Sequence, residues 1–202
     1  MGIRRSWAVL VVLSTPALAG ASDHNFEVFF APSALFVKGS TSDVYGWHAG
    51  ASAVTPWFGK KLSFIGDISS HFVGKDAKTG ADLTQTSVLV GPRFTFLSGK
   101  SHDFMPFVHV VFLGAVVESR AAAGATPALQ SMTGSFAVGA GFDVSRGDTP
   151  EEKNWGTRLQ FDYIQPIANE AVHKSFRLSI GVIYRFHDPH PEEKAVKEKK
   201  GS

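Results

Sequence analysis

The chain has 202 residues, of which 44% are hydrophobic, and its 20 basic and 18 acidic side chains leave a formal net charge of +2. A chain so close to neutral lacks the basic surface that neutralises nucleic-acid phosphates, so we expect no nucleic-acid partner. It contains no cysteine, which excludes disulfide bonds and thiolate metal sites.

The N-terminus has the pattern of a secretory signal peptide. Arg4 and Arg5 form a basic start, an apolar stretch follows at residues 7–13, and residues 17–19 (Ala-Leu-Ala) are a small-x-small cleavage site. The apolar stretch is shorter than the ~18 residues that a membrane-spanning helix requires. We therefore expect residues 1–19 to be removed during export. Because both arginines are lost, the 20 basic side chains fall to 18 and balance the 18 acidic ones.

The remaining chain contains eight segments in which apolar and polar side chains alternate. A period of two is typical of β-strands with one apolar and one polar face, and Gly, Ser, Asp, Lys and Pro fill the intervals as turns require. No run after the signal contains ~18 uninterrupted apolar residues, so no spanning helix is predicted. The predicted strands are residues 25–36, 45–57, 62–72, 84–96, 106–117, 135–144, 155–166 and 175–186.

The first and fifth segments leave their register open. Phe29 with Phe30, and Val110 with Val111, are apolar on both faces. An even number of up-and-down strands places both chain ends on one side of the sheet. The outward loops are then predicted at residues 37–44, 73–83, 118–134 and 167–174, of which only the third is long.

Residues 175–186 show the alternation most clearly. Every even position is apolar or aromatic, and on the odd side only Ile183 interrupts a series of Ser, Arg and Gly. The segment exceeds the ~5–6 residues of an ordinary strand and is long enough for the ~9–11 tilted residues that cross a bilayer. Its apolar face has Phe176 at one end and Tyr184 with Phe186 at the other, as at the two interfaces of a membrane strand.

Alternation alone does not show which face points inward. A soluble lipocalin-like barrel has an apolar interior, whereas a membrane barrel has a polar lumen and an apolar outer face. Gly50, Gly91, Gly139, Gly141 and Gly181 all fall on the polar face, and a narrow eight-stranded interior requires small or mutually pairing side chains. We therefore predict that the apolar face contacts lipid, and a soluble lipocalin-like carrier is the alternative.

Together these features resemble the small eight-stranded outer-membrane β-barrel family of Gram-negative-type envelopes. The export signal, residues 90–94 (Val-Gly-Pro-Arg-Phe), residues 136–144 and the closing residues 184–186 (Tyr-Arg-Phe) carry the resemblance, which covers about residues 24–186. It implies an all-β, antiparallel, up-and-down transmembrane barrel in the outer membrane, surrounded by lipid and inserted by the barrel assembly machinery.

The segment after the last strand, residues 187–202, is a charged tail. It is too short and too polar to bury a core of its own, so we expect it to be disordered in the periplasm. Contact of this tail with peptidoglycan is the functional alternative.

Four acidic and four arginine side chains fall on the predicted inner face. Charges in a narrow lumen must pair or be hydrated, so we interpret them as a hydrogen-bonded network that fills the barrel. A small-solute channel that opens when these pairs exchange partners is the alternative, although an eight-stranded barrel has little room for a permanent pore. The predicted network consists of Glu27, Asp67, Arg93, Asp143, Arg158, Asp162, Arg177 and Arg185.

No metal or cofactor site is predicted. His48, His71 and His109 fall on the inner face, but their spacing matches no metal motif, and scattered, hydrogen-bonded histidines are the simpler interpretation. Residues 139–141 (Gly-Ala-Gly) are not a dinucleotide fingerprint, because no helix is predicted to follow them.

An enzymatic alternative rests on Ser69, Ser70 and His71. The resemblance allows it, because some small outer-membrane barrels are lipid A deacylases or acyltransferases that use Ser and His. Adjacent strand residues face opposite sides, so Ser70 and His71 cannot form a nucleophile–base pair without a bulge. The sequence therefore favours a non-enzymatic barrel with a structural, envelope-integrity or surface-interaction role.

Overall fold

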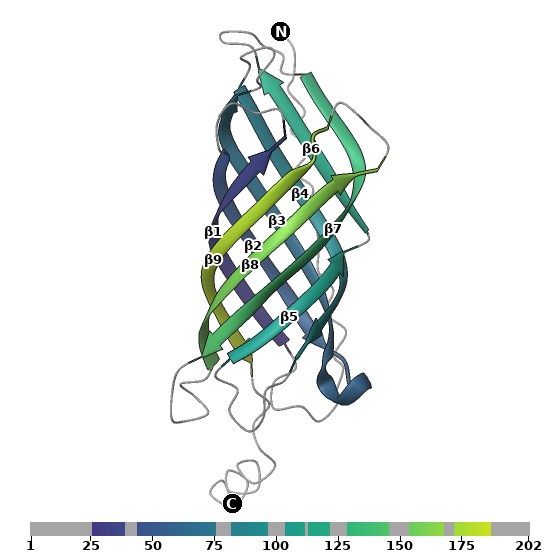
Figure 1. Ribbon diagram of the computed structural model, residues 1–202, viewed down its shortest axis with the longest axis vertical. Coiled ribbons are helices and arrows are strands. Elements are labelled where there is room, and N and C mark those ends of the chain that lie inside the picture. The colour runs from purple at the N-terminus through teal and green to yellow at the C-terminus, as the bar shows by residue number, and fades with distance from the viewer. Residues whose placement is uncertain are drawn as a thin grey trace, which may run out of the picture.

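The computed structural model describes residues 26–38, 44–75, 82–96, 104–111, 113–121, 129–145, 154–167 and 172–186. The predicted signal peptide and the predicted tail lie outside these ranges. The described residues form an antiparallel sheet that closes into a barrel (Figure 1). Its strands are β1 (Phe26–Val37), β2 (Val44–Val54), β3 (Leu62–Lys75), β4 (Asp82–Thr95), β5 (Phe104–Val111), β6 (Leu113–Ala121), β7 (Leu129–Ser145), β8 (Trp155–Pro166) and β9 (Ser175–Phe186).

The nine strands occupy eight positions around the barrel. β1 pairs with β2 on one side and with β9 on the other, and β3 pairs with β4. Both β5 and β6 lie between β4 and β7, so they are two parts of one barrel strand. The sheet is therefore a closed eight-stranded barrel, as the alternation predicts. In the described ranges no helix is long and apolar enough to cross a membrane.

The fifth barrel strand contains one extra residue between its two parts. β4 pairs Arg93 with His109 of β5 but Val90 with Leu113 of β6. The numbers of two paired residues therefore add up to 202 along β5 and to 203 along β6, which is a shift of one residue. A one-residue shift of this kind is a β-bulge, and it reverses which side chains face inward. The odd-numbered His109 is buried in β5, whereas the even-numbered Glu118 is buried in β6.

This bulge corrects two predictions. Residues 106–117 are not one strand with a single phase, because the phase changes where β5 gives way to β6. The third outward loop is also shorter than residues 118–134, since β6 continues to Ala121 and β7 begins at Leu129. Unbroken alternation marks strands reliably, so predicted and observed bounds agree fully for β8 and β9.

The second predicted strand is too long at its end. β2 stops at Val54, and a short 3-10 helix, Trp57–Lys60, follows it. Pro56 precedes this helix and has no backbone N–H to donate to a neighbouring strand. The third strand, by contrast, extends past residue 72 to Lys75, with a register shift between His71 and Gly74.

The apolar faces of the strands point outward. Phe30, Phe64, Ile180 and Val182 are half-exposed or more, while their polar neighbours are buried. An apolar outer surface around a polar interior is the arrangement of a membrane barrel. It contradicts the lipocalin-like alternative, which requires an apolar interior.

Aromatic side chains gather at both ends of this outer face. At the end of the barrel where β1 begins and β9 ends, the ring centroids of Trp155 and Tyr184 are 4.7 Å apart, and those of Phe26 and Phe186 are 5.6 Å apart. At the opposite end, Tyr163 lies 5.0 Å from Phe176. Two such girdles mark the two interfaces of a bilayer.

We expect the lipid face to tolerate charge poorly in the middle and better at its edge. Ile180, midway along β9, is 56% exposed on the outer face. Ile180→Arg should lower the free energy of unfolding by about 2–4 kcal/mol, because the guanidinium would lie near the bilayer midplane. Urea unfolding in lipid vesicles, followed by tryptophan fluorescence, measures this loss.

Val144→Arg is the matched control. Val144 also faces outward but lies next to the last residue of β7, so its loss should be no more than about 1 kcal/mol. Equal losses for the two variants would contradict the placement of the membrane along the barrel.

Candidate functional site

The barrel interior contains two layers of charged side chains. The terminal layer lies at the end where β1 begins and β9 ends, and it consists of Glu27, Arg93, Asp143, Arg158 and Arg185. The central layer lies further along the axis, and it consists of His48, Asp67, His109, Asp162 and Arg177. All ten side chains are buried. Together the two layers take side chains from every barrel strand, and each layer takes them from five strands.

Glu27 is the hub of the terminal layer. Its carboxylate accepts hydrogen bonds from Arg93 Nη1 and, at 2.6 Å, from Arg158 Nη2. Arg158 also binds Asp143 through two parallel bonds, Nε to Oδ1 at 2.7 Å and Nη2 to Oδ2 at 2.9 Å. Arg185 donates to Asp143 Oδ2 at 3.0 Å and to Ser145. Such charge-assisted, bidentate bonds are strong and geometrically specific.

Two inward-facing aromatic rings pack against this layer. The guanidinium carbon of Arg158 lies 4.7 Å from the ring centre of Phe29 and 5.0 Å from that of Phe107. Arg93 lies 5.3 Å from the Phe107 ring. These cation–π contacts fix the planes of two guanidinium groups and fill the space beside them.

Arg177 is the hub of the central layer. It donates to Asp162 Oδ2 at 2.8 Å and to Asp67 Oδ2 at 3.0 Å. His109 Nε2 lies 2.7 Å from Asp162 Oδ1, and His48 Nε2 lies 3.4 Å from Asp67 Oδ2. A chain of alternating His, Asp, Arg, Asp and His therefore runs across the lumen from β2 to β5.

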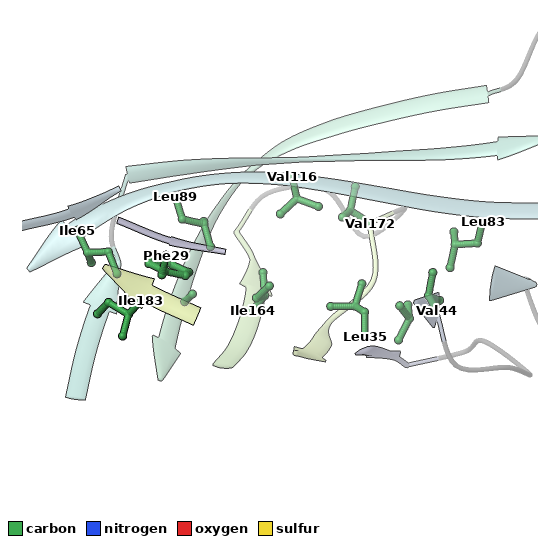
Figure 2. Close-up of a cluster of buried hydrophobic side chains, with 12 residues drawn as sticks. Phe29, Leu35, Val44, Ile65, Leu83, Leu89, Val116, Ile164, Val172 and Ile183 are labelled. Carbon is green, nitrogen blue, oxygen red and sulfur yellow. The ribbon is translucent and has the colours of Figure 1, made fainter. Parts of the chain in front are cut away.

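Buried apolar side chains also form a cluster inside the barrel (Figure 2). The cluster takes side chains from β1, β2, β3, β4, β6, β7, β8 and β9, together with Val172, which precedes β9. Figure 2 shows Phe29, Ile65, Leu89 and Ile183 at the left of the view and Leu35, Val44, Leu83 and Val172 towards the right. Leu35, Val44 and Leu83 belong to the strand ends opposite the terminal layer. Nearby, the backbone N–H and Nδ1 of His173 each lie 3.1 Å from a carboxylate oxygen of Glu118.

All eight residues predicted for the lumen network are buried inside the barrel, where they form two separate layers. Sequence reasoning did not include His48 and His109 in the network, although it placed both on the inner face. It also missed Glu118, because the bulge moves this residue from a predicted loop into the lumen. The available signal was the spacing. Val116 and Glu118 are two residues apart and therefore share a face of the strand, which Val117 between them does not.

The residues proposed for catalysis do not form a nucleophile–base pair. Ser70 Oγ hydrogen-bonds Thr86 Oγ1 at 3.0 Å, and Ser69 Oγ lies 2.8 Å from Ser87 Oγ. His71 instead shares a 2.7 Å bond with Ser33, inside the barrel. Among the described residues, no group of three or more His, Asp or Glu could hold a metal ion.

The fold has clear counterparts among solved structures, although no protein-family model and no curated protein matches the chain. Neisserial surface protein A has a TM-score of 0.60 and 17% sequence identity over 83% of this chain and 100% of that chain. Ail, the attachment invasion locus protein of Yersinia pestis, has a TM-score of 0.51 and 17% identity over 80% of this chain and 97% of its own. The chain therefore has the fold of the small eight-stranded outer-membrane β-barrels, with its strands crossing the membrane and two charged layers inside.

Proposed function

We propose that this outer-membrane barrel is a non-enzymatic structural protein that contributes to envelope integrity, with its lumen closed by the two charged layers. The observation that carries the proposal is the continuity of the ion pairs. Each acidic residue of the two layers pairs with an arginine at 3.0 Å or less. Such pairs fill the interior of a barrel that has little room for a pore.

The ion pairs link strands that are not neighbours in the sheet. Arg158 on β8 reaches Glu27 on β1, and Arg177 on β9 reaches Asp67 on β3. One strand, β9, lies between the first two partners, and two strands, β1 and β2, lie between the second two. These contacts tie the wall together across the lumen, and a solute could pass only if they separated.

The alternative function is a small-solute channel that opens when charged pairs exchange partners. The buried apolar cluster disfavours it, because ions cross dry apolar constrictions poorly. Contacts with the barrel assembly machinery, and of the tail with peptidoglycan, are further parts of the proposal. A surface-interaction role belongs to the loops, which lie largely outside the described residues.

A filled lumen should not conduct ions. Purified protein in planar bilayers should show no steady large conductance, because we expect the ion pairs and the buried apolar side chains to fill the narrow lumen. Single-channel recording measures this directly, with empty detergent as the control. Long-lived open events from the folded protein would favour the channel instead.

The second prediction concerns the central layer. Arg177→Met should lower the free energy of unfolding by about 3–5 kcal/mol, because it leaves two buried carboxylates without their cation. Urea unfolding at pH 8, where free histidines are neutral, measures the loss. The triple variant Arg177→Met, Asp67→Asn, Asp162→Asn is the control and should recover most of it. A single variant as stable as the parent would show that the layer does not hold the barrel together.

The third prediction concerns lipid A. Mass spectrometry of lipid A from cells with and without the gene should give the same acyl pattern, since no lipid-facing nucleophile–base pair is formed by Ser69, Ser70 and His71. Ser33→Ala tests one of the two buried Ser–His pairs of the described residues, Ser33–His71, and Ser179→Ala tests the other, Ser179–His48. An acyl change that disappears in either variant would overturn the non-enzymatic assignment.

A further inference from the structure

The charges of the terminal layer do not balance. Glu27 and Asp143 supply two negative charges, while Arg93, Arg158 and Arg185 supply three positive ones. All five side chains are at least nine-tenths buried. No other charged side chain of the described ranges forms an ion pair with them. Among the described residues, one positive charge is therefore left over in a place where an unpaired charge is costly.

The terminal layer cannot remove this charge by titration. Guanidinium groups stay protonated at any physiological pH, and protonating a carboxylate would only increase the excess. The central layer differs, because its two aspartates outnumber Arg177 and each of them contacts a histidine. Of the two described layers, the terminal one alone has more arginines than carboxylates.

Two buried donors of this layer, and a third on a residue beside it, have no hydrogen-bond partner among the described residues. They are Arg158 Nη1, Arg185 Nε and Ser52 Oγ. Arg185 Nε lies 3.8 Å from Glu27 Oε2, which is beyond hydrogen-bond reach. The three residues are only 1–2% exposed, so bulk water does not account for their free N–H and O–H groups.

The three donors belong to residues that are neighbours of Glu27. Ser52 on β2 and Arg185 on β9 are the direct register partners of Glu27 on its two sides. Arg158 reaches the same carboxylate from β8. Two guanidinium groups and a hydroxyl, all with unused donors and with a surplus positive charge, have the chemistry of an anion site.

We propose that the terminal layer binds one small monovalent anion, such as chloride, through Arg158, Arg185 and Ser52. One charge restores neutrality, and the narrow lumen excludes larger anions. The anion site can be tested whether or not the barrel conducts, so it does not depend on the structural role proposed above.

Bromide is the probe, because it replaces chloride and scatters X-rays anomalously. Crystals of the detergent-purified protein grown in sodium bromide should show an anomalous peak within the terminal layer. In solution, the urea midpoint should rise as bromide replaces gluconate at constant ionic strength, and it should rise with the logarithm of the bromide concentration once the site is filled, because a ligand that binds only the folded state stabilises it. Gluconate is too large for the lumen.

Three serine variants test the residues. Ser52→Ala should weaken bromide binding about tenfold, the value of one hydrogen bond to a charged group. Ser52→Asp places a carboxylate beside Glu27 and supplies the missing charge, so the bromide dependence should disappear. Ser87→Ala, which removes a lumen hydroxyl that pairs with Ser69, should leave bromide binding unchanged. Heat-modifiable mobility in gels shows that each variant is folded.

Two results would overturn the proposal. One is bromide found only on the outer surface of the crystallised protein, an adventitious ion. The other is an unfolding midpoint of the parent protein that is the same in bromide and in gluconate, which would mean that the excess charge is balanced by the chain itself or by water.

Discussion

The narrow lumen is the constraint on which the rest of this structure depends, because every strand must place every second side chain in it. Glycines provide the space. Gly139 is the register partner of both His109 and Asp162, and a Cβ at this position would lie 2.1 Å from Asp162 Oδ1 and 2.6 Å from His109 Nε2. The His109–Asp162 pair therefore exists because nothing stands between its members. The glycines on the polar faces are not merely permissive of strands; they set where the charged side chains can meet.

Charge pairing inside this space does more than fill it. Replacing buried ion pairs by apolar side chains is often neutral for stability, so stability alone does not account for four buried arginines. Register does, because a one-residue slip would turn every side chain of a strand to the opposite face. A slip of β9 would expose Arg177 and Arg185 to lipid, at a cost of about 2–4 kcal/mol for each one near the midplane. The charged layers thus specify which face is inside.

The strands with the most regular alternation could be predicted best from the sequence. The division of the charged side chains into two layers could be predicted least well. β8 and β9 were predicted to the residue, because apolar and polar side chains alternate along most of both segments, with Ile164 and Ile183 as the exceptions on the polar faces. The fifth strand was not, because a bulge is a one-residue event that composition does not mark. The division into two layers was hidden for a different reason, which is the tilt of the strands. Arg93, His109, Gly139, Asp162 and Arg177 follow one another along a single hydrogen-bond ladder. Arg93 and Arg177 nevertheless belong to different layers, and a linear pattern carries no information about that stagger.

The two strands with ambiguous registers show how the charges resolve an apolar pattern. Phe29 and Phe30 are interchangeable by hydrophobicity, as are Val110 and Val111, so packing against lipid would accept either register. Glu27 in the first case and His109 in the second are not interchangeable with their neighbours, because each has partners only inside the lumen. With Glu27 inside, Phe29 must also point inward, where it packs beneath Arg158, and Phe30 must face lipid. The apolar side chains supply the energy of insertion, and the few charged ones decide which of two equally apolar arrangements is adopted.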